Sequence, residues 1–280
     1  MLKQRVITAI VLLAVLLPAL FYQTATPFCA LALVLIGAGA WEWSRLNGEK
    51  PLFCIAWAAL CVALCAAAWT GGWLTQTLPI FWVLIGAGWV LGGAFLLSRG
   101  VPGWVRIPRL IRLPFGVLAL WAAWLAVAQA RVIGVEFLLS ILLLVWVADI
   151  GAYFAGRRFG GKFSRKKLAA SISPGKSWEG VWGGTVGVLT MAFAWIALQP
   201  GGQTVFHSLL NQYGVLFMAL ALIFLVMMSV VGDLVESLVK RSAGAKDSSG
   251  LLPGHGGVLD RIDALLPTLP LAMMLVSFLI

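Results

Sequence analysis

Residues that can do chemistry are concentrated between Asp233 and Asp263. This stretch holds five of the ten acidic residues, four of the twenty bases and one of the two histidines in a chain of 280 residues. Glu236, Ser237 and Lys240 follow Asp233 by three, four and seven residues, so the four side chains line one face of a helix. Paired acids beside a basic loop favour a divalent-cation site, and oxygen ligands favour Mg²⁺ or Mn²⁺ over zinc.

The segment that follows, 242–257, is rich in glycine and serine. It cannot form a stable span, but its backbone amides can approach a phosphate closely. If it folds back as a hairpin, Asp233 and Asp260 can approach one another and share a metal. The chemistry-bearing side chains of this loop and of the helix start after it are Lys246, Asp247, His255, Asp260, Arg261 and Asp263.

Two upstream features extend this set. Asp149 lies inside an apolar run, where an acid costs about 2.5–3.5 kcal/mol at mid-membrane, so we expect it to face a polar cavity or a partner and to be functional. Tyr153, one turn later, is on the same face. In 171–180, backbone amides at a helix start together with Lys176 would make an anion site suited to a polyphosphate, although the sequence is not a Walker A motif.

Glycines follow this turn at small-xxx-small spacing. They predict close contact with another helix, either within the chain or across a homodimer, and both alternatives stay open. The glycines are Gly180, Gly183, Gly184 and Gly187.

An apolar scaffold must position these groups. Hydrophobic residues make up 61% of the chain and charged residues 11%, and the mean hydropathy is +1.00, which predicts an all-α polytopic integral membrane protein. A membrane-spanning helix needs roughly 20 apolar residues, and about nine such runs occur. The expected spans are 6–22, 28–44, 52–70, 79–97, 114–130, 137–155, 179–198, 213–234 and 264–280.

The bases fix the expected orientation. With a cytoplasmic N-terminus, every basic loop lies inside and only Arg131 lies outside, as the positive-inside rule requires. The net charge of +10 therefore suits anionic lipid and anionic substrates rather than nucleic acid. We expect residues 1–130 to form a scaffold of about five spans. Residues 131–280 would form a catalytic region of about four spans, with cytoplasmic loops 156–178 and 235–262.

The basic segment 98–113 is amphipathic and contains two prolines. Arg106, Arg109 and Arg112 recur at helical spacing. They either face lipid phosphates at the membrane surface or serve only as topology charges, and both alternatives stay open.

Other polar groups receive simpler interpretations. We expect Glu42 to be a solvated acid at the headgroup level and His207 a solvated loop residue. The four cysteines form no CxxC or Cys/His cluster, so we expect neither a zinc site nor a disulfide framework.

Several of these residues together resemble a known family. The runs Ser237-x-x-Lys240-Arg241, Lys246-Asp247, Pro253-Gly254-His255-Gly256-Gly257 and Asp260-Arg261-x-Asp263 resemble the signature of phosphatidate cytidylyltransferases, also called CDP-diacylglycerol synthases. Two upstream runs resemble the same family: Asp149-x-x-Ala152-Tyr153 and Ser173-Pro174-x-Lys176-Ser177-x-Glu179-Gly180.

The resemblance implies a Mg²⁺-dependent reaction of CTP with phosphatidic acid that gives CDP-diacylglycerol and pyrophosphate, with one or two metal ions and Mn²⁺ as a substitute. The implied metal ligands are Asp233 and Asp260, and their implied partners are Asp149, Asp247 and Asp263. The bases implied to hold the triphosphate and the lipid phosphate are Lys176, Lys240, Arg241, Lys246 and Arg261. Further substrate contacts would come from Ser173, Ser177, Ser237, Gly256 and Gly257. His255 would donate a hydrogen bond or a proton, or serve only the loop's structure.

The implied location is the bacterial cytoplasmic (inner) membrane, with the active site at its cytoplasmic boundary. The expected partners are CTP, phosphatidic acid and anionic membrane lipid, without nucleic acid. Two rival interpretations remain open. One is a related CTP-dependent membrane enzyme that acts on an ether-lipid phosphate or a polyprenol. The other is a transporter, which also places acids within membrane helices but near the bilayer midplane.

Overall fold

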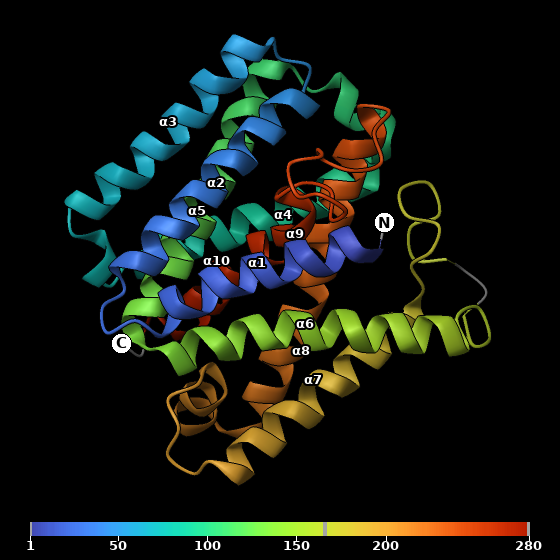
Figure 1. Ribbon diagram of the computed structural model, residues 1–280. Coiled ribbons are helices and arrows are strands. Elements are labelled where there is room, and N and C mark those ends of the chain that lie inside the picture. The colour runs from blue at the N-terminus through green and yellow to red at the C-terminus, as the bar shows by residue number, and fades with distance from the viewer. Residues whose placement is uncertain (1, 165–166, 279–280) are drawn as a thin grey trace.

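The fold is a bundle of helices (Figure 1). The computed structural model describes residues 2–164 and 167–278, and within these ranges it contains no named β-strand. The expected all-α polytopic fold is confirmed. The elements are α1 (Leu2–Phe21), α2 (Thr26–Leu46), α3 (Pro51–Thr70), the 3₁₀ turn η1 (Trp73–Thr75), α4 (Pro79–Arg106), α5 (Arg109–Ile133), α6 (Val135–Phe159), α7 (Trp178–Leu198), α8 (Val205–Ser242), α9 (Leu259–Ile262) and α10 (Leu265–Val276).

Local chemistry explains where several helices begin. α2, α3 and α4 each carry a proline in the first turn, where its missing N–H costs nothing. Ser177 caps α7 by accepting a hydrogen bond from the Gly180 amide, and Thr204 caps α8 by accepting one from the His207 amide. These caps fix the first turns of α7 and α8.

The number of spans differs from the expected nine. In the part of the chain that the structure describes, eight helices, α1 to α8, are long and apolar enough to cross a membrane. The ninth expected span, 264–280, corresponds to α10, which has only 12 residues. Residues 279 and 280 lie outside the described residues. A helix of this length falls well short of a bilayer crossing, so the count of nine is not confirmed.

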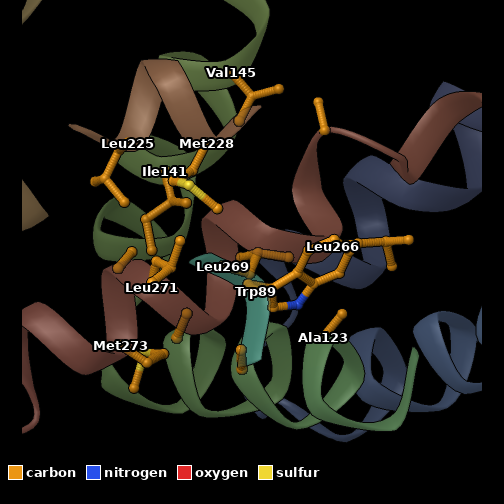
Figure 2. Close-up of a cluster of buried hydrophobic side chains, with 14 of the residues drawn as sticks. Trp89, Ala123, Ile141, Val145, Leu225, Met228, Leu266, Leu269, Leu271 and Met273 are labelled. Carbon is orange, nitrogen blue, oxygen red and sulfur yellow. The ribbon is translucent and has the colours of Figure 1, made fainter. Parts of the chain in front are cut away.

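α10 is instead a core element. Leu269, Leu271 and Met273 of α10 are buried, and Figure 2 shows them beside Ile141 of α6 and Leu225 of α8. The helix also packs on α4 and α5. It therefore joins the expected scaffold region to the expected catalytic region. The expected boundary at 130/131 falls inside the last turn of α5 and stays a prediction.

Two long helices are bent at glycines. Gly100 in α4 has a φ of 63° and Gly214 in α8 has a φ of 81°, a left-handed region that suits glycine. The first bend and Pro108 make an elbow between α4 and α5 out of the expected amphipathic segment 98–113. The second bend turns the first residues of α8 away from the rest of that helix.

His207 lies in this first part of α8, and the expectation that it is a solvated loop residue is wrong. It is only 5% exposed. Its Nδ1 lies 2.7 Å from the Thr204 hydroxyl and its Nε2 lies 3.0 Å from the Gln199 carbonyl oxygen. The imidazole therefore supplies hydrogen-bond partners to two polar groups of the α7–α8 turn, the Thr204 hydroxyl and the Gln199 carbonyl oxygen.

α6 and α7 lie side by side (Figure 1) and pack closely at the glycines of α7. A Cβ at Gly184 would lie 2.6 Å from the Ala148 carbonyl oxygen, and one at Gly183 would lie 2.1 Å from the Ala155 Cβ. The predicted close helix contact is thus confirmed, and it is made within the chain. A homodimer stays a prediction.

The two ends of α1 contact different parts of the chain. At one edge, the Thr8 hydroxyl near the start of α1 donates to the Pro253 carbonyl oxygen at 2.9 Å. At the other end of α1, Arg131 donates to the carbonyl oxygens of Leu20 and Tyr22 at 2.9 and 2.6 Å. Arg131, the one base expected outside, therefore lies at the far end from the charged loop. Which edge faces the cytoplasm stays a prediction.

Candidate active site

A cavity of about 320 Å³ opens between α6, α7 and α8. We call it the Asp149 cavity, because Asp149 lines it together with Tyr153, Lys176, Ser177 and Asp233. The Lys176 ammonium lies 2.5 Å from Asp233 Oδ2. Asp149 therefore faces a cavity, and Lys176 and Ser177 of the 171–180 turn line the same cavity.

The start of α7 supplies a further positive element. Its first backbone amides are not all consumed within the helix, and the helix dipole adds partial positive charge there. Gly180 and Gly184 also line the cavity, since they allow α7 to approach α6 closely. Ser173 lies just outside this lining and accepts a hydrogen bond from the Lys176 amide through its carbonyl oxygen at 3.2 Å.

Glu179 secures the loop that leads into α7. Its Oε1 accepts hydrogen bonds from the backbone amides of Phe163 and Ser164 at 3.1 and 2.8 Å. The carboxylate therefore ties the beginning of the 156–178 loop to the first turn of α7, beside Lys176. Two bases of that loop, Arg165 and Lys166, lie outside the described residues.

A second charged cluster joins the end of α8 to α9. Lys240 Nζ lies 2.6 Å from Asp260 Oδ1 and also pairs with Glu236, one turn earlier on α8. The predicted hairpin, which brings the start of the last helical segment to the end of α8, is confirmed by this contact. Within the helix, the Ser237 hydroxyl donates to Asp233 Oδ1 at 3.2 Å, so the predicted helical face is present.

Asp260 is held by many donors. Its Oδ2 accepts the backbone amides of Ser248 and Gly257, each at 2.8 Å, and lies 2.9 Å from the Ser248 hydroxyl. Burial disfavours the ionised form, but Lys240 and the two amides outweigh it and lower the pKa of Asp260 to about 2. Asp260 is therefore an anchor of the loop between α8 and α9 as well as an acid.

Glu42 is a residue of this site that the sequence interpretation missed. Its side chain is fully buried, so the expectation of a solvated acid is wrong. It accepts hydrogen bonds from the backbone amides of Val258 and Leu259 at 2.9 and 2.7 Å, lies 3.0 Å from the Ser248 hydroxyl, and accepts one from the Ser249 hydroxyl. The signal was an acid inside the expected span 28–44, where the argument applied to Asp149 applies equally.

Asp263 follows α9 and lies near Asp233. Burial raises the pKa of Asp263, and the carboxylate of Asp233 adds to the rise. Its Oδ1 accepts the Ala264 amide at 2.7 Å. Asp233 and Asp260 themselves have separate partners, since Lys176 pairs with the first and Lys240 with the second.

The remaining expected residues lie around the loop. Arg241, Lys246 and Asp247 are exposed. Arg261 donates twice to the His255 carbonyl oxygen, at 3.1 and 2.7 Å, and so closes its own turn. The buried Nδ1 of His255 has no partner among the described residues. Gly256 and Gly257 allow the tight turn. Gly256 has a φ of 83°, and a Cβ on Gly257 would collide with Ser248 and Glu42.

The donor set fits Mg²⁺ at the Asp149 cavity. Mg²⁺ is usually held by one or two carboxylates together with water and substrate phosphates, and Asp149 and Asp233 offer two carboxylates there. No group of three or more His, Cys, Asp or Glu side chains arranged for a metal occurs in residues 2–164 and 167–278. Both oxygens of Asp260 already accept protein donors, so a cation at Asp260 would have to displace one of them.

The chain is similar in sequence to known proteins over nearly its whole length. The chain is 39% identical over 275 residues to phosphatidate cytidylyltransferase of Pseudomonas aeruginosa, which covers 96% of this chain and 95% of the relative. It is 36% identical over 290 residues to the Haemophilus influenzae enzyme of the same name, covering 96% of each. A Brucella melitensis relative of that name is 44% identical over 134 residues, or 47% of this chain and 43% of its own.

The family match extends over residues 3–279 and includes both charged clusters, the Asp149 cavity and the helices that carry them. Because it spans nearly the whole chain and agrees with relatives of similar length, the chain belongs to the cytidylyltransferase family.

Proposed function

We infer that this protein transfers CMP from CTP to phosphatidate, giving CDP-diacylglycerol and pyrophosphate. The observation that carries the inference is the similarity, over 96% of the chain, to proteins named for this reaction. The Asp149 cavity supplies a place where it can occur, because it combines a lysine and a helix start for phosphates with walls made of apolar helices for a lipid.

The reaction needs two anions to meet. A phosphate oxygen of phosphatidate attacks the α-phosphorus of CTP, a P–O bond to that phosphorus forms, and the bond to the β-phosphate oxygen breaks so that pyrophosphate leaves. The lipid phosphate is already anionic near neutral pH, so no strong base is required. The residues must instead bring the phosphates together and stabilise the charge that develops on the leaving group.

Lys176 and the start of α7 are placed for this task. The ammonium lies in the cavity beside Asp233, so it can move from that carboxylate to a phosphate oxygen over a short distance. Lys240 is held by Glu236 and Asp260, so we assign it first to fixing the α8–α9 hairpin. The exposed Lys246 and Arg241 can meet the triphosphate from the loop side.

We propose that Mg²⁺ is the cofactor and that Asp149 and Asp233 hold it, with Asp263 close by. When bound, the ion would neutralise phosphate charge and act as a Lewis acid on the phosphoryl oxygens. The arrangement that supports this proposal is two carboxylates facing one cavity. The second expected ligand, Asp260, stays a prediction.

We also propose that the charged edge faces the cytoplasm of a bacterial cell and that the chain lies in the cytoplasmic membrane. CTP would then reach the Asp149 cavity from solution, while phosphatidate would reach it from the bilayer. The distribution of bases along the sequence supports this orientation. A homodimer is compatible with the fold, but the glycine face of α7 is already used by α6.

The test is an assay of the full chain in detergent micelles with CTP labelled at its α-phosphate. Label should move to the lipid fraction with phosphatidate, and much less with an ether-lipid phosphate, a polyprenol or a polyprenol phosphate. Chelation of divalent ions should abolish the transfer and added Mg²⁺ should restore it. Transfer to another acceptor alone would refute the substrate, and transfer that survives chelation would refute the cofactor.

A variant pair ties the activity to the cavity. Lys176→Met removes the ammonium and should lower kcat/KM about 10- to 100-fold, the range for one charge-assisted hydrogen bond. Lys162→Met is the matched control, since Lys162 stacks near Phe159 in the same loop and does not line the cavity. If both variants transferred CMP with equal kcat/KM, the reaction would not take place in this cavity.

A further inference from the structure

A second cavity lies outside the candidate active site, at the elbow between α4 and α5. We call it the elbow groove. Its volume is about 520 Å³, within the range of small-ligand sites. The end of α4 and the start of α5 line it, and it shares no lining residue with the Asp149 cavity. Its lining includes Gly92, Phe95, Arg99, Trp104, Arg106, Ile111 and Arg112.

Three arginines gather at this groove without an acid to balance them. Arg99 stacks over the Phe95 ring at 5.4 Å and Arg112 over the Trp104 ring at 5.6 Å, whereas Arg106 is exposed. None of the three forms an ion pair in the part of the chain that the structure describes. An uncompensated set of planar donors of this kind attracts phosphate, which guanidinium groups bind through paired hydrogen bonds.

Two buried N–H groups of the same lining also lack acceptors. Trp104 is only 2% exposed, and neither its Nε1 nor the Nε of Arg112 has a hydrogen-bond partner within residues 2–164 and 167–278. Buried donors are normally paired, so two orphans in one wall indicate a place where an acceptor is missing.

The rest of the wall is apolar and continues into surface that faces outward. Phe95 and Ile111 line the groove and are 50% and 59% exposed, and neighbouring Leu110 is 84% exposed. In a membrane protein, such side chains lie against lipid acyl chains. The groove therefore places a phosphate-binding set beside an acyl-binding wall.

The groove lies at the same edge as the charged loop. The Trp43 indole of α2 donates to the Arg112 carbonyl oxygen at 3.1 Å, and Arg109 donates to the Gly48 carbonyl oxygen at 3.3 Å. Glu42, next to Trp43, anchors Val258 and Leu259. The edge where lipid headgroups would meet this protein thus includes the elbow.

We propose that the elbow groove binds an anionic glycerophospholipid, with the phosphate against Arg106 and Arg112 and an acyl chain against Phe95 and Ile111. This site is separate from the one where phosphatidate reacts. Zwitterionic lipid binds it less well, because its headgroup cation is repelled by the three arginines.

Native mass spectrometry of the full chain in non-ionic detergent can count bound lipids. The probes are phosphatidylglycerol and phosphatidylcholine; phosphatidate is avoided because it would also enter the Asp149 cavity. Wild type should retain at least one phosphatidylglycerol more tightly than phosphatidylcholine. The double variant Arg106→Gln/Arg112→Gln should weaken that binding at least about tenfold, as expected for lost charge-assisted hydrogen bonds.

Arg109→Gln is the matched control, because Arg109 belongs to the same segment but bonds Gly48 and does not line the groove. It should change the affinity about twofold or less, through long-range charge alone. Equal losses in the control and the double variant, or no preference for phosphatidylglycerol in wild type, would overturn the proposal.

Gly92→Leu tests the acyl wall without changing charge and decides the matter if the arginine variant does not fold. A Cβ at Gly92 would meet the Phe115 ring at 3.6 Å, an ordinary contact, so the larger side chain fills the groove. It should weaken phosphatidylglycerol about as much as the double variant does. If Gly92→Leu binds normally and glycerol phosphate displaces the lipid, the groove takes a free phosphate and the lipid proposal fails.

Discussion

Glu42→Gln is the sharpest perturbation that the structure offers, because it changes one atom of a fully buried side chain. The carboxylate accepts the amides of Val258 and Leu259 on different oxygens, Oε1 and Oε2. A glutamine has one oxygen and one NH₂ group. Whichever way the amide is placed, one of these two backbone N–H groups faces another donor and loses its acceptor.

The serine contacts of Glu42 cannot repair this loss, but they can adapt to it. The Ser248 hydroxyl lies 3.0 Å from Glu42 and 2.9 Å from Asp260, and its single proton can be donated to only one of them at a time. With glutamine it can donate to Asp260 and accept from the NH₂ group. The net penalty is therefore one unsatisfied buried N–H, about 1–3 kcal/mol, or roughly a 5- to 140-fold rise in the open fraction of this loop.

Hydrogen exchange measures that fraction directly. Amides of 248–259 should exchange faster by this factor in Glu42→Gln, while peptides of α6 and α7 keep their protection. Transfer activity should fall as well, since Asp260 moves with the loop. Glu49→Gln, an acid in the turn after α2 with no side-chain hydrogen bond among the described contacts, is the control. Unchanged exchange at 248–259 in Glu42→Gln would refute the anchoring role.

Gly183→Leu should destabilise the fold by at least about 1–3 kcal/mol, because even its Cβ would lie 2.1 Å from the Ala155 Cβ. The measurement is a lower unfolding temperature. Gly187→Ala is the control and should lower that temperature less, because its Cβ would lie 3.3 Å from its nearest neighbour. Because the folded pKa of Asp260, about 2, lies below its unfolded value near 3.9, its contribution of about 2 kcal/mol is present above pH 4 and is lost as pH falls toward 2. Wild type should therefore lose more unfolding temperature on acidification than Asp260→Asn does. Finally, Asp233→Asn should abolish CMP transfer yet leave exchange at 248–259 unchanged, whereas Asp260→Asn should increase that exchange.

The sequence predicted the features that depend on residues close together in the chain. Apolar runs of about 20 residues located α1 to α8, and the glycine spacing of α7 located its contact with α6. The cost of an isolated acid in an apolar helix placed Asp149 in a cavity. The spacing of Asp233, Ser237 and Lys240 placed them on one face of α8.

What depended on distant partners could not be predicted in this way. Glu42 meets residues more than two hundred positions later in the chain, and no local pattern indicates such a pairing. The 264–280 run is apolar enough for a span, but α10 packs inside the bundle and ends at Val276. The ion pairs Lys176–Asp233 and Lys240–Asp260 also depend on the three-dimensional fold. The sequence alone does not tell which lysine pairs with which aspartate.

The two acids expected to share a metal differ most in how much of their hydrogen-bonding capacity the protein already uses. Asp233 is about one-third exposed, at 32%, and contacts one lysine and one hydroxyl. Asp260 is 7% exposed and accepts a lysine and two backbone amides beside a serine hydroxyl. An incoming cation can therefore approach Asp233 by displacing Lys176 alone, but at Asp260 it would undo the loop. Glu42 and Asp260 thus hold the loop in place, and exchange of partners is concentrated at Lys176 and Asp233.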